Sequence, residues 1–142
     1  MAFLPKLSGQ WELFYPKKTA SQAFISGSLM DWPASPTGYV VKATSTTTKS
    51  AGISQRTVTA SDSDYASNTR IPCLRPIVPR ALMICTTTGA VETAVVGLRC
   101  DLTDDVTLNV GASSVGRVLV EEFYSATLVG GYLLGPSETG AS

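Results

Sequence analysis

The stretch that decides the fold covers residues 94–134, with the sequence AVVGLRCDLTDDVTLNVGASSVGRVLVEEFYSATLVGGYLL. It consists of short apolar, β-branched runs that are separated by Gly, Asp and Ser. β-Branched residues favour strands, whereas Gly, Asp and Ser favour turns. The stretch therefore predicts the larger part of a β-sheet, with its last two strands at 117–124 and 126–134, and it contains no obvious reaction centre.

The same pattern of short apolar runs separated by turn residues continues through the rest of the chain. We expect further strands at 11–15, 23–31, 39–43, 51–60, 71–80, 81–87, 93–100 and 106–110, and a turn at 101–105. Segment 71–80 holds three prolines, which cannot donate to a strand ladder, so it is expected to be an edge strand or an extended connector. No segment has the spacing of an amphipathic helix. About eight to nine short strands predict an all-β domain, an antiparallel sandwich or barrel.

The first 22 residues differ from the rest because they are rich in large apolar groups without helical or strand spacing. We expect residues 1–22 to form an extended arm that docks on its own domain or on a partner. The alternative is that 11–15 is a first strand in the chain's own core. The β-domain would then cover 23–135 and a flexible tail 136–142. The predicted interface residues of the arm are Phe3, Leu4, Leu7, Trp11, Leu13, Phe14 and Tyr15.

The composition narrows the classes of function. The chain has 142 residues, enough for one domain with a real core. Eleven basic residues balance eleven acidic ones, which disfavours nucleic-acid binding because phosphate neutralisation needs a cationic surplus. Histidine is absent, and with it the commonest general base and metal ligand. The three cysteines are widely spaced and are expected to be buried free thiols. We therefore expect no cofactor, no metal and no membrane span.

Two groups of residues resemble catalytic motifs and are expected to be structural. Residues 111–116 loosely match a phosphate-binding loop, but Arg117 and Val118 follow where that loop requires Lys and Ser or Thr, so we expect a turn. Glu121 and Glu122 are adjacent in a predicted strand, so they should point to opposite faces and share no site.

Two clusters of aspartates stand in predicted turns, one at Asp62 and Asp64 and the other at Asp101 and residues 104–105. Aspartates in turns usually bond their own backbone, so we expect no catalytic residues and no enzyme. A small lyase or hydrolase would be indicated if a pocket held Asp62, Asp64 or Glu122 with a raised pKa.

The middle of the chain resembles the small head-decoration proteins of tailed bacteriophages. The similarity lies in GYVVKATSTTTKSAGISQRTVTASDSDYASNTRIPCLRP, with an ATS turn at 43–45, Gly52-Ile53, DSDYAS at 62–67 and IPC at 71–73. It extends over about 24–134. Cys73 departs from the usual apolar residue, and the arm does not align. The resemblance implies a β-rich protein, often trimeric, on the capsid exterior between capsomers.

Together these observations predict a non-enzymatic virion structural protein, made in the host bacterial cytoplasm. It would be a capsid decoration or cement protein that forms a homotrimer and binds the outer surface of the major capsid protein lattice. We expect it to bind no nucleic acid, membrane or small-molecule substrate. The alternative is another phage virion component, such as a tail part, a head-fibre base or a host-binding β-module.

Overall fold

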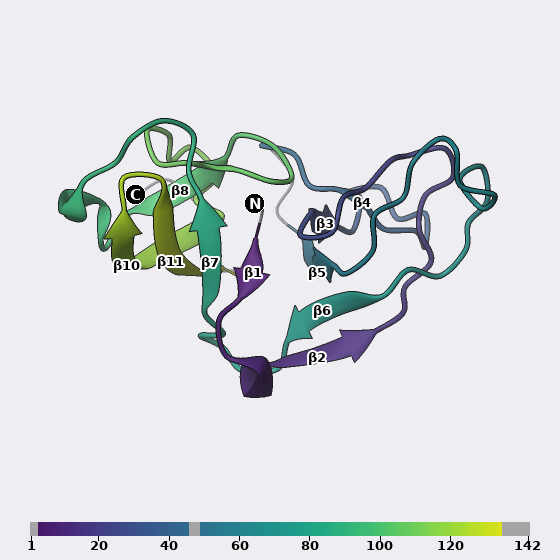
Figure 1. The fold of residues 1–142 in the computed structure, drawn as a ribbon, viewed down its shortest axis with the longest axis horizontal. Coiled ribbons are helices and arrows are strands. Elements are labelled where there is room, and N and C mark those ends of the chain that lie inside the picture. Colours follow the sequence, from purple (N-terminus) through teal and green to yellow (C-terminus); the bar gives the residue numbers. More distant parts are fainter. Residues whose placement is uncertain (1–2, 46–48, 135–142) are drawn as a thin grey trace.

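The computed structural model describes residues 3–45 and 49–134, and these residues form an all-β structure of two antiparallel sheets (Figure 1). The predicted fold class is confirmed. Eleven strands are present, and two of the connections contain a single 3₁₀ turn, η1 (Ser8–Gln10) and η2 (Thr93–Val95). The predicted tail at 136–142 lies outside the described residues. No helix within the described ranges is long and apolar enough to cross a membrane.

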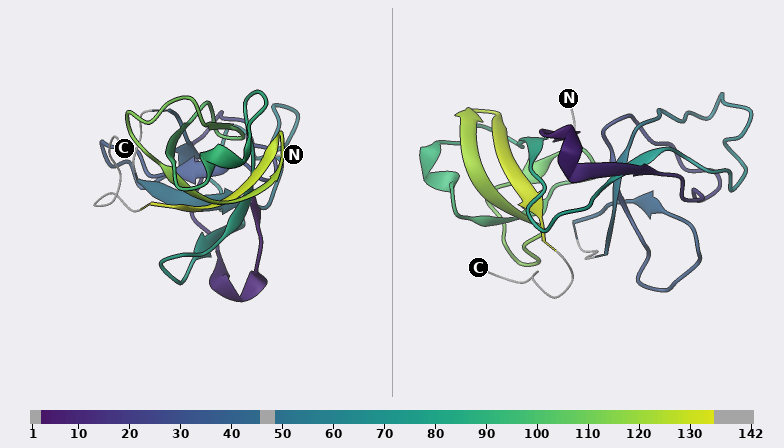
Figure 2. Two further views of the ribbon diagram at one scale, coloured as in Figure 1. Left: turned by 90° about the vertical axis from the view of Figure 1, so that its left-hand side faces the viewer. Right: turned by 90° about the horizontal axis from the view of Figure 1, so that it is seen from below.

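The larger sheet has six strands in the order β1-β7-β11-β10-β8-β9. Their bounds are β1 Leu4–Pro5, β7 Met83–Thr86, β8 Arg99–Leu102, β9 Leu108–Asn109, β10 Val118–Ser125 and β11 Leu128–Leu133. The sheet curls strongly, as Figure 2 shows. A parallel bridge between Thr87 and Leu108 joins the end of β7 to β9, and the Thr88 N–H donates to the Leu108 carbonyl. The sheet is therefore a half-barrel that partly closes on itself.

The smaller sheet has five strands in the order β2-β6-β5-β3-β4. Their bounds are β2 Trp11–Phe14, β3 Leu29–Asp31, β4 Val41–Lys42, β5 Ser50–Ser54 and β6 Cys73–Pro76. This sheet lies beside the half-barrel, and the long connections between residues 15 and 72 lie on its other side (Figure 1).

Two apolar clusters occupy the two faces of the smaller sheet. The first fills the half-barrel and includes Leu29 and Ile53 from the smaller sheet together with Met83, Val118 and Val129 from the larger one. The second lies under the long connections and contains Phe24, Met30, Val40, Ala51, Val58, Ile71 and Cys73. The smaller sheet is therefore covered on both faces, and β3 is buried along its whole length.

A buried ion pair joins the two sheets. Arg117, which precedes β10, donates from Nη2 to the Asp31 carboxylate at 2.7 Å, and both side chains are completely buried. The same guanidinium donates to the Ser50 hydroxyl at 2.7 Å and to the Thr44 carbonyl at 3.3 Å. Its Nε has no partner within the described residues. Arg117 therefore ties the larger sheet to β3 and to the start of β5.

The prediction that 71–80 is an edge strand or connector is wrong, because β6 pairs with β2 on one side and with β5 on the other. Proline is tolerated there for a geometric reason. Hydrogen-bonded and non-hydrogen-bonded pairs alternate along an antiparallel ladder. The Ile77 N–H donates to the Gln10 carbonyl, so the next pair, Pro76 with Trp11, needs no hydrogen bond between the strands. On the other side of Pro76, the β5–β6 pairing has already ended at Leu74.

Two further expectations are corrected. Residues 93–95 form η2, and the strand expected at 93–100 begins only at Arg99, so Asp101 lies in β8 and not in a turn. The strands expected at 39–43 and 106–110 are shorter than predicted, because β4 and β9 have only two residues each. Strands this short are held by their neighbours more than by their own sequence pattern.

Candidate interaction surface

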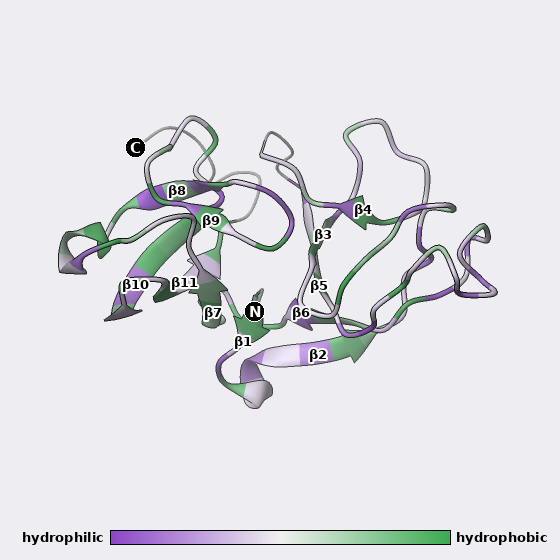
Figure 3. Ribbon diagram, turned by 45° about the horizontal axis from the view of Figure 1, so that its top comes forward, coloured by the Kyte–Doolittle hydropathy of each residue, from purple (hydrophilic) through white to green (hydrophobic). Residues whose placement is uncertain are grey.

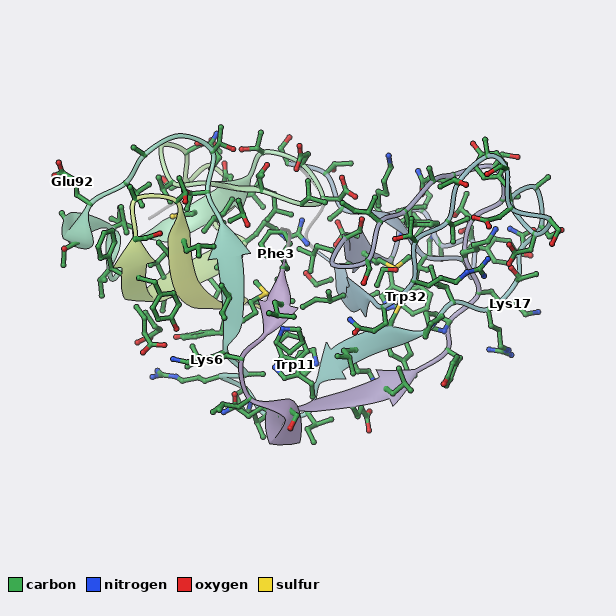
Figure 4. All side chains as sticks on the ribbon, in the orientation of Figure 1. Phe3, Lys6, Trp11, Lys17, Trp32 and Glu92 are labelled. Carbon is green, nitrogen blue, oxygen red and sulfur yellow. The ribbon has the colours of Figure 1, made fainter. Side chains whose placement is uncertain are left out.

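The N-terminal segment contributes a strand to each sheet. β1 pairs with β7 in the larger sheet, and β2 pairs with β6 in the smaller one. Phe3 and Trp11 point into the space between the sheets (Figure 4), where they belong to the first apolar cluster. The Trp11 indole N–H also donates to the Leu82 carbonyl. These two predicted interface residues are therefore part of the chain's own core, as in the alternative interpretation of this segment.

The other predicted interface residues lie at the surface. Leu4, Leu7, Leu13 and Tyr15 are 46–52% exposed. Phe14 is half-buried, and the Arg75 guanidinium stacks on its ring at 4.5 Å. The segment therefore carries exposed apolar residues, and the sequence pattern did not separate those that face outward from those that face the core.

Ile77 and Val78, next to this segment in space, add to its apolar surface. We use the term β2–β6 ribbon for residues 10–17 paired with 70–77. The pairing is regular throughout, from the Ile77 N–H to the Gln10 carbonyl, through the β2–β6 ladder, to the Lys17–Arg70 bridge. Ten large apolar side chains are exposed among the described residues, and six of them lie on this ribbon or in the chain segments that flank it: Leu4, Leu7, Leu13, Tyr15, Ile77 and Val78. Figure 3 shows that the apolar residues of β2 lie at its C-terminal end.

A polar cluster lies next to β1 on the larger sheet. Lys6 Nζ is 2.6 Å from Glu122 Oε1, the Tyr124 hydroxyl donates to the same oxygen at 2.5 Å, and Lys6 lies over the Tyr124 ring. The hydrogen bond from Lys6 lowers the pKa of Glu122 from its ordinary value, and the bond to Glu122 raises the pKa of Lys6. Gly130 makes room for the Tyr124 ring, since a Cβ there would lie 2.6 Å from the hydroxyl.

Glu121 and Glu122 border one shallow pocket of about 300 Å³ together with Arg80, Leu82 and Tyr132. The prediction that the two glutamates face opposite sides is wrong. The register shifts between Val120 and Glu122, which makes Glu121 the extra residue of a β-bulge. A bulge interrupts the alternation of side chains and redirects one of them. The pKa of Glu122 is lowered, however, which is opposite to the shift that a general acid requires.

The carboxylates of the 59–70 loop hold that loop in shape. Asp64 accepts two hydrogen bonds from Arg56 and one from the Thr69 hydroxyl, and these hold the pKa of Asp64 well below its ordinary value. Asp62 accepts from the Thr59 N–H, as expected of an aspartate in a turn.

Lys18, which the sequence did not single out, is completely buried against the same loop. Its ammonium donates to the carbonyls of Asp64, Tyr65 and Ser67 at 2.6–3.2 Å. A lysine ammonium has three protons to donate, and here each has an acceptor. Lys18 therefore organises this loop from the inside.

The segment that resembles a phosphate loop does bind an anion, but the anion is internal. The N–H groups of Ser114, Val115 and Gly116 all donate to the Asp101 carboxylate at 2.7–3.0 Å. Consecutive backbone N–H groups that converge in this way form an anion-binding nest. Asp101 is buried and fills the nest, so the turn predicted for 111–116 is a closed structural unit.

The three cysteines are free and buried, as predicted. Burial raises the pKa of Cys73 to about 12 and that of Cys100 to about 11, and it raises the pKa of Cys85 as well. Thiols in this state are poor nucleophiles and poor metal ligands. In the described part of the chain, no three His, Cys, Asp or Glu side chains are grouped so that they could hold a metal ion.

These contacts occupy the buried polar side chains, and the exposed apolar side chains on and next to the β2–β6 ribbon remain available. Comparisons of the chain with models of protein families and with curated proteins found no match.

Proposed function

We propose that the chain is a non-enzymatic structural protein of a tailed-phage virion that decorates the outer surface of the head. In this role it binds the major capsid protein lattice between capsomers and stabilises the shell as a homotrimer. The observation that carries the proposal is the concentration of exposed apolar side chains on and next to the β2–β6 ribbon. A concentration of exposed apolar side chains in one region marks a candidate protein-binding site.

The electrostatics support a binding function over an acid–base one. Glu122 and Asp64, the carboxylates that a lyase or hydrolase would use, are held by Lys6 and Arg56, and the pKa of each is lowered. A carboxylate that stays ionised in an ion pair is a poor proton donor at neutral pH.

The end of the ribbon at η1 is the part that we assign to the shell. Leu7 and Ile77 are each just over half exposed there. The base of the turn is held firmly, because the Gln10 side chain accepts from the Leu82 N–H and the Trp11 indole donates to the Leu82 carbonyl. A rigid apolar projection loses little conformational entropy when it docks.

The test measures occupancy on heads that lack the protein. The double variant Leu7→Ser and Ile77→Thr should bind at least about tenfold more weakly than the parent, since about two buried apolar side chains are lost. Val96→Thr with Leu98→Thr is the matched control, because these residues are similarly exposed on another part of the surface. Equal occupancy of both folded variants would overturn the assignment of this surface. Particle images that show the protein on the tail would favour the alternative virion component.

A further inference from the structure

Among the described strands, β2 differs from the other sheet edges because its outer edge is open. In the β2–β6 ladder the backbone hydrogen bonds are made by the even-numbered residues of β2, as the bond from the Ile77 N–H to the Gln10 carbonyl establishes. The backbone groups of Leu13 and the N–H of Tyr15 therefore point away from the sheet. None of them has a hydrogen-bond partner in the described part of the chain.

The remaining edges are covered. On β1 the outward positions are Phe3, whose N–H donates to the Gly27 carbonyl, and Pro5, which has no N–H. On β4 the Lys42 N–H donates to the Gln22 side chain. On β9 the Leu108 carbonyl accepts from the Thr88 N–H. Exposed edges are normally protected by proline, charge or a covering segment. At the outward positions of β2 between 11 and 15, the one such group among the described residues is Arg70, whose Nη1 donates to the Tyr15 carbonyl at 2.8 Å.

The open window has a defined length. It ends on one side at Trp11, whose N–H donates to the Ser8 carbonyl, and on the other at Lys17, whose carbonyl accepts from the Val40 N–H. The free groups are thus centred on residues 13–15. An antiparallel strand that pairs there can form only a few backbone hydrogen bonds, so its side chains must supply the rest of the affinity.

We propose that this window is the site at which a second copy of the chain pairs, strand β2 against strand β2, about a two-fold axis through Phe14. In this register Leu13 of each copy stands opposite Tyr15 of the other. The Tyr15 N–H can donate to the Leu13 carbonyl, and the Leu13 N–H can donate to the second lone pair of the Tyr15 carbonyl, which also accepts from Arg70. The contact differs from the three-fold association that the proposed function includes, and it does not depend on a capsid.

The side chains of the window are self-complementary in this register. Leu13 and Tyr15 are each about half exposed, and each would be covered by the other in the second copy. The two Phe14 rings would meet on the opposite face. Of the nearby charges, Glu12 and Arg75 already pair at 2.6 Å within one copy, and Arg70 donates to the Tyr15 carbonyl. The apolar, self-complementary Leu13 and Tyr15 side chains select a second copy over a charged peptide.

The experiment measures mass and amide exchange over a range of protein concentrations. Analytical ultracentrifugation of the full chain should show reversible association that doubles the number of copies. The amides of Leu13 and Tyr15 should gain protection from hydrogen exchange as that association proceeds. Leu13→Pro removes the outward N–H and spares the bonds to β6, and it should weaken the doubling about ten- to hundredfold because two hydrogen bonds are lost per dimer. Leu13→Thr, which keeps the N–H, should weaken it less.

If Leu13→Pro does not fold, Leu13→Lys gives the same test, because it keeps the N–H and brings a charge into the contact. A native-like melting transition with Trp11 fluorescence identifies a folded variant. A parent that shows no doubling at the highest soluble concentration would overturn the proposal. So would doubling that is unchanged in the proline and lysine variants, or protected amides without doubling, which would point to a strand from another protein.

Discussion

The two sheets treat their edges in opposite ways. The half-barrel covers both of its edges, with Pro5 and a bond to Gly27 on β1 and the Thr87–Leu108 bridge on β9. The five-stranded sheet covers β4 but leaves β2 open, next to six of the exposed apolar side chains. The difference indicates a division of roles in which the half-barrel provides a closed, stable body and the smaller sheet presents the surface available for assembly.

Separating the two sheets should have the largest effect. Asp31→Ala leaves Arg117 buried without its carboxylate, and breaking a buried pair in this way costs about 3–5 kcal/mol. Urea denaturation followed by Trp fluorescence should show this loss in the free energy of unfolding. Glu12→Ala, which breaks an exposed pair with Arg75, is the control and should cost less than about 1 kcal/mol. Similar losses in both variants would show that the ion pair does not join the sheets energetically.

Crowding the smaller sheet alone should have a moderate effect. A Cβ at Gly52 would lie 2.4 Å from the Leu74 carbonyl oxygen, so Gly52→Ala must push β5 and β6 apart. Overpacking of this kind costs about 1–3 kcal/mol. Gly9→Ala is the matched control, because a Cβ there meets nothing within 4 Å. Because β6 carries β2, Gly52→Ala should also weaken association through β2. A stable Gly52→Ala protein with normal association would contradict the tight strand approach.

Removing the cation under the 59–70 loop should have a similar but more local effect. Lys18→Met keeps the length of the side chain but leaves three carbonyls without their donor, which costs about 1–3 kcal/mol. Lys17→Met alters an exposed neighbour and should be close to neutral. Hydrogen exchange should increase in the loop and leave the half-barrel unaffected. Faster exchange throughout the molecule would show that the loop and the half-barrel unfold together.

The smallest effect is expected from pH. The folded-state pKa of Asp64 is lowered by Arg56, so this group stabilises the fold above its ordinary value of 3.8, and the stabilisation is lost as the pH falls below that value. The parent should therefore be more stable than Asp64→Asn at pH 7, and the difference should shrink as the pH falls towards 2. A stability difference that stays constant from pH 7 to pH 2 would show that the Arg56–Asp64 pair contributes nothing.

The sequence could predict what depends on local pattern. The strands β10 and β11 follow from alternating apolar runs, and the apolar surface near β2 follows from a cluster of large residues outside any regular spacing. Only pairing over long distances could place Phe3 and Trp11 in the core. The Asp31–Arg117 pair is indicated in the sequence only weakly, by a charged residue next to each of two apolar runs. The bulge at Glu121 is not indicated at all, because a register shift depends on the sequences of both paired strands.

The position of β1 and β2 has a consequence for the order of folding. Leu4 pairs with Ile84, which lies 80 positions later, and Trp11 pairs with Pro76. Closing loops of this length costs chain entropy before any contact repays it, and contacts of this kind slow folding. The β10–β11 hairpin, by contrast, joins neighbouring segments. We therefore expect the hairpin to form early and the N-terminal strands to dock late, so that the surface available for assembly is completed only when the rest of the fold is in place.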